Sequence, residues 1–90
     1  MANEMTKLIN ALIALEIPHE VIPQPAWDNA PQVWYPSCDN CSIDVISHWG
    51  AMGGRDGLLE MWDSDDYEPV GYLTACQVLE KILEKNEKKA

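Results

Sequence analysis

The chain has 90 residues, and its 15 acidic residues outnumber six basic ones to give a formal net charge of −9 at pH 7. A chain of this length is one domain with a thin core, so we assign residues 1–90 to a single domain. Residues 1–73 carry twelve acidic residues against Lys7 and Arg55, a net charge of −10. Such a surface repels phosphate backbones and anionic membranes, which argues against direct nucleic-acid or membrane binding and favours a basic protein partner.

Targeting signals are not apparent in the sequence. No stretch approaches the roughly 20 apolar residues that span a bilayer. Residues 1–7 lack the basic start and apolar run of a secretory signal. We therefore expect a cytoplasmic protein whose three cysteines are thiols rather than disulfides.

Residues 3–15 are predicted to form a helix. Asn3 can cap its first turn, and Pro18 ends it because the residue before a proline is pushed out of the helical region. Apolar side chains recur at helical spacing on one face, which is typical of a helix that packs on a core. These residues are Met5, Leu8, Ile9, Leu12 and Ile13.

The next segment, residues 18–36, contains five of the six prolines, which excludes a long central strand. It is expected to hold a short edge strand, an irregular loop through Trp27 and Asn29, and a second strand. Two better strands follow, and the glycine-rich loop between them predicts an antiparallel hairpin. In chain order the predicted strands are residues 20–22, 32–35, 42–47 and 58–62.

A second helix is predicted from Thr74 onward. Thr74 and Gln77 have the form of a capping box, and apolar residues follow at helical spacing. Two amphipathic helices need a common apolar partner. We therefore expect a two-layer α+β domain in which both helices pack on one face of a small antiparallel sheet of three or four strands.

Cys38 and Cys41 form a Cys-x-x-Cys pair, the spacing of half a zinc knuckle or of a redox motif. Tetrahedral zinc needs four ligands, and the other candidates are Cys76, His48 and His19, with no second pair. Pro36 and Asp39 indicate a turn rather than the helix N-terminus that activates a redox cysteine. We expect a plain turn with no metal or other cofactor, in preference to zinc or redox chemistry.

The loop at residues 50–57 contains four glycines and the only arginine. It lacks the ending of a Walker motif and does not match Gly-x-Gly-x-x-Gly. Successive glycine N–H groups can still form an anion-binding nest, but the same composition is typical of a hairpin turn. Both interpretations remain open. The candidate contacts of an anionic nucleotide are His48, Gly53, Gly54 and Arg55.

Catalysis is not expected. Ser47 and His48 are adjacent on a predicted strand, where side chains point to opposite faces, so they cannot share a proton directly. The sequence also lacks a nucleophile elbow. We therefore predict that the protein is not an enzyme.

The acidic run at residues 63–68 does not match a calcium-binding EF-hand, because the required glycine and terminal glutamate are misplaced. Trp62 and Tyr67 add aromatic side chains of the kind that anchor protein interfaces. A solvated loop is the commonest meaning of such a run, and a partner-binding surface is the alternative that these aromatic side chains indicate. The candidate partner-binding residues are Trp62, Asp63, Asp65, Asp66, Tyr67 and Glu68.

Four short motifs, Asp44–Ile46, His48, Gly57–Glu60 and Val70–Ala75, together resemble a pattern in small phage and prophage proteins of Gram-positive bacteria. The resemblance covers roughly the second half of the chain and assigns no functional residue. It implies a setting in which accessory phage proteins inhibit host machinery or host defence, as short acidic anti-CRISPR proteins do.

The expected function is therefore a non-enzymatic phage-type inhibitor in the host cytoplasm. It would bind a basic groove of a nucleic-acid-handling or defence protein through its acidic surface and compete with the nucleic acid. One alternative is a small-molecule binder that sequesters an anionic nucleotide signal in the glycine-rich loop. Another is a structural accessory phage protein without a site.

Overall fold

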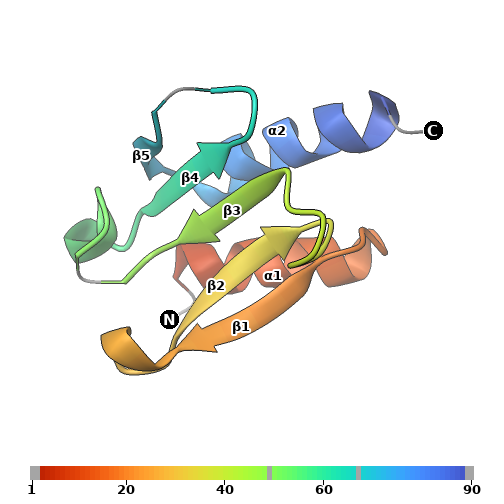
Figure 1. The fold of residues 1–90 in the computed structure, drawn as a ribbon. Helices are drawn as coiled ribbons and strands as arrows, with labels where there is room; N and C mark the ends of the chain where they lie inside the picture. Colours follow the sequence, from red (N-terminus) through yellow and green to blue (C-terminus); the bar gives the residue numbers. More distant parts are fainter. Residues whose placement is uncertain (1–2, 49, 67, 89–90) are drawn as a thin grey trace.

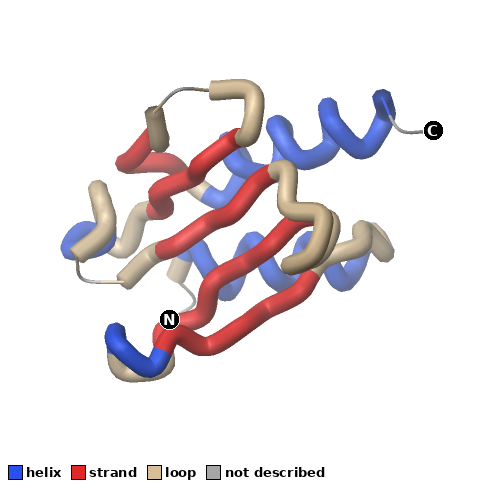
Figure 2. Tube along the Cα trace, in the orientation of Figure 1, coloured by secondary structure: helices blue, strands red, loops and turns tan. Residues whose placement is uncertain are grey.

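A computed structural model describes residues 3–48, 50–66 and 68–88 of the protein, which form a curved sheet with two helices behind it (Figures 1 and 2). Short 3-10 helices occur at Pro25–Trp27 and Gly54–Asp56. Within these described ranges, no helix combines the length and apolar character that crossing a membrane requires. In chain order the main elements are α1 (Glu4–Ala14), β1 (Glu20–Gln24), β2 (Ala30–Tyr35), β3 (Ile43–Ile46), β4 (Leu59–Asp63), β5 (Val70–Leu73) and α2 (Ala75–Lys88).

The strands lie in the order β1-β2-β3-β4-β5, and each pairs antiparallel with its neighbours. The predicted hairpin between the third and fourth strands is confirmed, with Val45 opposite Met61. The sheet has five strands among the described residues, so the predicted number of three or four was too low. The missed strand, β5, is only four residues long, contains Gly71, and bends at Tyr72, whose φ is 57°.

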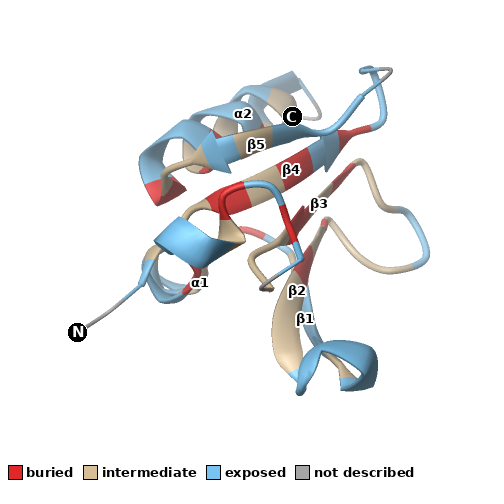
Figure 3. Cartoon of the chain, turned by 90° about the vertical axis from the view of Figure 1, so that its left-hand side faces the viewer, coloured by how far each residue is buried: buried red, intermediate tan, exposed pale blue. Residues whose placement is uncertain are grey.

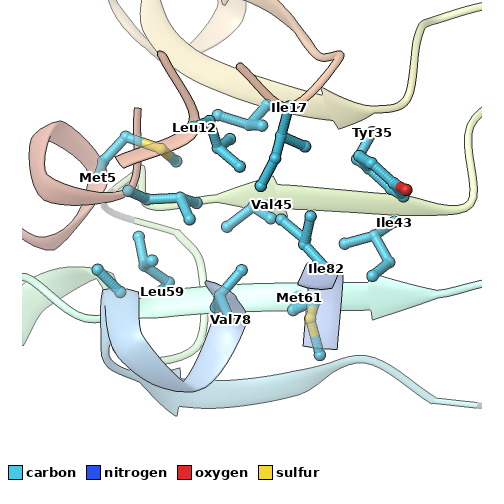
Figure 4. Packing of buried hydrophobic residues seen from close by; sticks show 13 residues of the cluster. Met5, Leu12, Ile17, Tyr35, Ile43, Val45, Leu59, Met61, Val78 and Ile82 are labelled. Atoms are coloured by element: carbon cyan, nitrogen blue, oxygen red, sulfur yellow. The ribbon is translucent and has the colours of Figure 1, made fainter. Parts of the chain in front are cut away.

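Both helices cover the same face of the sheet, as predicted (Figure 3). Alternate residues of the central strands point toward the helices because successive side chains of a strand face opposite ways. Side chains from α1, α2 and the strands interlock in one cluster (Figure 4). Its buried members are Met5, Leu8, Leu12, Ile17, Val33, Tyr35, Ile43, Val45, Leu59, Met61, Ala75, Val78 and Ile82.

The helix starts follow the expected capping chemistry. Asn3 Oδ1 accepts a hydrogen bond of 2.8 Å from the Thr6 N–H at the start of α1. At the start of α2, the Gln77 N–H donates to Thr74 Oγ1 over 3.3 Å, and the Thr74 N–H donates to Gln77 Oε1 over 2.8 Å. These reciprocal bonds confirm the predicted capping box.

A further hydrogen bond joins the two helices. The Ala75 N–H at the start of α2 donates to Glu4 Oε1 over 2.8 Å. A helix N-terminus leaves its first N–H groups unpaired, so a carboxylate from α1 satisfies one of them and fixes the relative position of the helices.

Replacing Leu12 by Ala should lower the free energy of unfolding by about 3 kcal/mol, because Leu12 is fully buried between α1 and the sheet. Leu15, at the end of the same helix, is 53% exposed, so Leu15→Ala should change stability by less than about 0.5 kcal/mol. Urea denaturation of both variants measures the difference. Equal losses in the two variants would contradict the described packing of α1.

Candidate partner-binding surface

The acidic run follows directly from the end of β4. Successive side chains of a strand point to opposite faces of the sheet. Leu59, Met61 and Asp63 therefore share the face that the helices cover. Asp63 is consequently only 3% exposed, and its Oδ1 lies 2.6 Å from Lys85 Nζ on α2. The prediction that Asp63 presents its charge to a partner is therefore wrong, because this carboxylate is buried and neutralised within the protein.

Hydrogen bonds fix the protonation states of this pair. Burial alone would raise the pKa of Asp63, but the hydrogen bond from Lys85 and one from the Asp65 N–H hold that pKa below its ordinary value. Burial opposes the charge of Lys85 in the same way, yet its hydrogen bonds with Asp63 and Asp65 raise the pKa of the ammonium group. Both groups stay charged at neutral pH.

The rest of the acidic run leads away from this buried pair. The Asp66 N–H donates to the Asp63 carbonyl over 2.9 Å, which turns the chain outward. Asp65 keeps 84% of its side chain exposed although its Oδ2 lies 3.1 Å from Lys85 Nζ, and Asp66 and Glu68 are also exposed. Tyr67 lies outside the described residues. Three carboxylates close in sequence are thus exposed to solvent.

Trp62 lies on β4 but faces away from the helices, and it is 37% exposed. On the same face the strand register places Asp44 of β3 opposite Trp62, and Trp34 of β2 opposite Asp44. Glu20 of β1 ends this cross-strand row, opposite Trp34. Of these residues, only Trp62 could be predicted as a site residue from the sequence, because the others become its neighbours only once the strand register is known.

Asp44 is partly shielded from water in this row. Burial raises the pKa of its carboxyl group, a hydrogen bond with the Gln32 side chain partly opposes this, and the charge of Glu60 adds to the increase. The carboxylate therefore lacks the full solvation that it would have on an open surface.

The glycine-rich loop is packed against β5 rather than extended into solvent. The Tyr72 N–H donates to the Met52 carbonyl over 3.2 Å, and a side chain at Gly71 would come within 2.3 Å of Met52 Cβ. Beside it is a depression of about 420 Å³. The depression is lined by Gly50, Ala51, Met52, Gly53, Arg55, Asp56 and Tyr72.

An anion nest needs free backbone N–H groups, and most of those in this loop bind within the protein. The Gly54 N–H donates to the Ala51 carbonyl, and the Met52 N–H donates to Glu60 Oε1. The other loop residues with such internal bonds are Gly50, Ala51, Asp56 and Gly57.

The four predicted anion contacts are not gathered around the depression. Gly53 and Arg55 line it, but His48 and Gly54 do not. His48 instead stacks on Trp27, with ring centroids 4.0 Å apart, and its Nδ1 accepts the Gly50 N–H. The geometry therefore gives little support to phosphate binding here.

The cysteines occupy a turn between β2 and β3, as expected. The Cys38 N–H donates to Glu20 Oε1, which ties this turn to β1. Burial raises the pKa of both the Cys38 and Cys41 thiols, and the nearby carboxylates of Glu20 and Asp44 respectively add to the increase. Among the described residues, no group of three or more His, Cys, Asp or Glu side chains is arranged to hold a metal ion.

The chain matches no protein-family model, no curated protein and no solved structure. The acidic loop after β4 and the cross-strand row that includes Trp62 are the candidate recognition features of the described surface.

Replacing Lys85 by Met should lower the free energy of unfolding by about 3 kcal/mol at neutral pH, because it leaves the Asp63 carboxylate buried without its cation. The loss should shrink as the pH falls, since Asp63 then takes up a proton. In the double variant Asp63→Leu with Lys85→Met, much of the stability should return. Denaturant unfolding of the single and double variants measures these changes, and equal losses in both would contradict a buried ion pair.

In the unaltered protein the pair should stabilise the fold over a wide pH window. The pKa of Asp63 is lowered, so its contribution is complete above the unfolded value of about 3.9 and is lost as the pH falls through the folded value. The pKa of Lys85 is raised, so its contribution is complete below about 10.4 and is lost at higher pH. The stability difference from the double variant should therefore be constant from about pH 4 to about pH 10. A difference that changes near pH 7 would contradict this assignment.

Proposed function

We propose that this chain is a non-enzymatic inhibitor that binds a basic groove of a nucleic-acid-handling protein through its acidic surface and competes there with the nucleic acid. The distribution of charge is the observation that carries the proposal. Asp65, Asp66 and Glu68 are exposed and follow β4 closely in sequence, and none of the five strands contains a lysine or arginine.

Two of the described lysines are paired with carboxylates. Lys85 is 15% exposed and is held by Asp63 and Asp65, and Lys7 pairs with Glu4 over 2.9 Å on α1. Lys81 and Lys88 belong to α2, where the charge of Lys81 also acts on Asp63, and Arg55 lies in the glycine-rich loop. The acidic residues still outnumber the basic ones, 15 to six. A basic groove would therefore meet a negative potential when approached by the acidic loop, which speeds association.

The resemblance to small phage and prophage proteins supplies the biological setting of the proposal. An inhibitor carried by a phage would act in the host cytoplasm on a host defence or replication protein, as anti-CRISPR proteins do. An acidic surface that occupies a nucleic-acid groove suits this task, because one site would block the target without any catalytic residue.

Sequestration of an anionic nucleotide is the alternative function, with His48, Gly53, Gly54 and Arg55 as contacts. It is less favoured, because most N–H groups of the loop are bonded internally and the carboxylates of Asp56 and Glu60 lie close by. A structural accessory role is a further alternative, which requires neither surface.

The test compares two charge-matched variants in capture from a host-cell lysate. Asp65→Asn, Asp66→Asn and Glu68→Gln remove three charges from the acidic loop, whereas Glu80→Gln, Glu84→Gln and Glu87→Gln remove three exposed charges from α2. We expect the loop variant to lose the captured basic protein and the helix variant to retain it. Added duplex DNA and raised salt should both release the protein from the unaltered chain.

Equal capture by the unaltered chain and the loop variant would refute inhibition through the acidic loop. Co-purification of an anionic nucleotide with the unaltered chain, and its loss in the variant His48→Ala with Arg55→Ala, would favour the nucleotide alternative. The loop variant and the helix variant should both keep the fold, since their substituted side chains lie outside the buried cluster.

A further inference from the structure

The open face of the sheet carries a second recognition feature beside the acidic loop. Trp34, Asp44 and Trp62 stand opposite one another on β2, β3 and β4, on the face that the helices leave uncovered. Directly opposed residues have Cβ atoms about 5 Å apart. Asp44 therefore lies between the two tryptophans in this cross-strand row.

We propose that this cross-strand row of Trp34, Asp44 and Trp62 binds an arginine side chain of the basic partner. The inference rests on the proposed function in that the partner is a basic protein, and it adds which side chain is recognised and where. A guanidinium group can donate two parallel hydrogen bonds to one carboxylate while its flat faces stack on aromatic rings.

Lysine would suit the row less well. Its ammonium group is a strongly hydrated point charge that cannot bind a carboxylate in bidentate fashion or stack on an indole. The partly buried surroundings of Asp44 increase this difference, because entry of a cation requires removal of its water. Guanidinium is the more weakly hydrated of the two cations.

Polar groups on this face also remain unsatisfied. Trp34 Nε1 and Gln24 Oε1 are buried and have no hydrogen-bond partner among the described residues. Native proteins leave few buried polar atoms unpaired. A guanidinium group could satisfy the acceptor Gln24 Oε1, whereas the indole N–H of Trp34 is itself a donor and would need an acceptor of the partner, such as a backbone carbonyl. Gln24 and Trp34 belong to β1 and β2, and the buried core on the helix side of the sheet is almost entirely apolar.

The row lies beside the start of the acidic loop along β4. Trp62 immediately precedes the buried Asp63, and the Ser64 N–H donates to the Ser42 carbonyl over 2.8 Å, which holds the start of the loop beside the start of β3. A basic segment seated on the acidic loop therefore has Asp44 within reach. The row would recognise one arginine specifically, while the loop attracts positive charge in general.

The test is an NMR titration of the isotope-labelled protein with peptides of alternating arginine and glycine whose termini are blocked. In matched control peptides, lysine or the neutral isostere citrulline replaces arginine. We expect the arginine peptide to shift the indole N–H signals of Trp34 and Trp62 at the lowest concentration. The lysine peptide should bind more weakly, and the citrulline peptide should leave both signals unshifted. Citrulline shifting them as strongly as arginine would overturn the proposal.

A pair of variants separates this site from general attraction. Asp44→Asn should weaken binding of the arginine peptide about tenfold, which is the effect of losing one charge-assisted pair of hydrogen bonds. Glu84→Gln removes the same charge from the exposed side of α2 and should leave binding nearly unchanged. Equal weakening by the two substitutions would overturn the proposal. Asp44→Asn should retain the fold, since the folded protein already disfavours charge at this position.

The outcomes also separate this inference from the proposed function. If the arginine peptide binds the row but the acidic-loop variant still captures its partner from lysate, the proposed function fails and the arginine site stands. If loss of the loop charges abolishes capture but the arginine peptide shows no preference over citrulline, the arginine site fails and the proposed function stands.

Discussion

The pleat of the strands is the constraint on which the rest of this structure depends. It sends successive side chains to opposite faces, and both helices cover only one of those faces. Val45 and Met61 are consequently buried, while their neighbours Asp44 and Trp62 are turned away from the core. Among the described residues neither helix covers the second face, although the turn between β2 and β3 binds Glu20 there. That face is therefore where the protein can present recognition groups without loss of core packing.

The Asp63–Lys85 pair connects this arrangement to the acidic loop. Asp63 ends β4 on the covered face, where an unpaired carboxylate would be strongly destabilising, and α2 supplies the compensating ammonium group. The same ammonium group also binds Asp65, so one lysine holds both the strand end and the first exposed acid of the loop. The core and the proposed binding surface thus share a residue, and the fold determines where the exposed charges begin.

Periodicity and capping were sufficient to predict both helices and the central hairpin, because these elements have strong local patterns. β5 was missed because Val70–Leu73 contains Gly71 and has no alternation to indicate a strand. The acidic loop was visible in the composition. The burial of Asp63 was not predicted, although its alternation with Leu59 and Met61 agrees with it, and its partner lies on a distant helix that no local pattern connects to it. The row of Trp34 and Asp44 depends on strand register, which only the folded chain defines.

The central claim is that the acidic loop binds a basic host protein. Carbodiimide cross-linking in a lysate of host cells that contain the protein tests it most directly, since this reagent joins carboxylates to partner lysines only where the two groups touch. Mass spectrometry of the linked peptides identifies the carboxylates involved. The account predicts links from Asp65, Asp66 or Glu68 to a basic nucleic-acid-binding protein, and it predicts their loss when duplex DNA is added first. Links formed mainly by Glu80, Glu84 or Glu87 on α2, or links unaffected by DNA, would contradict it.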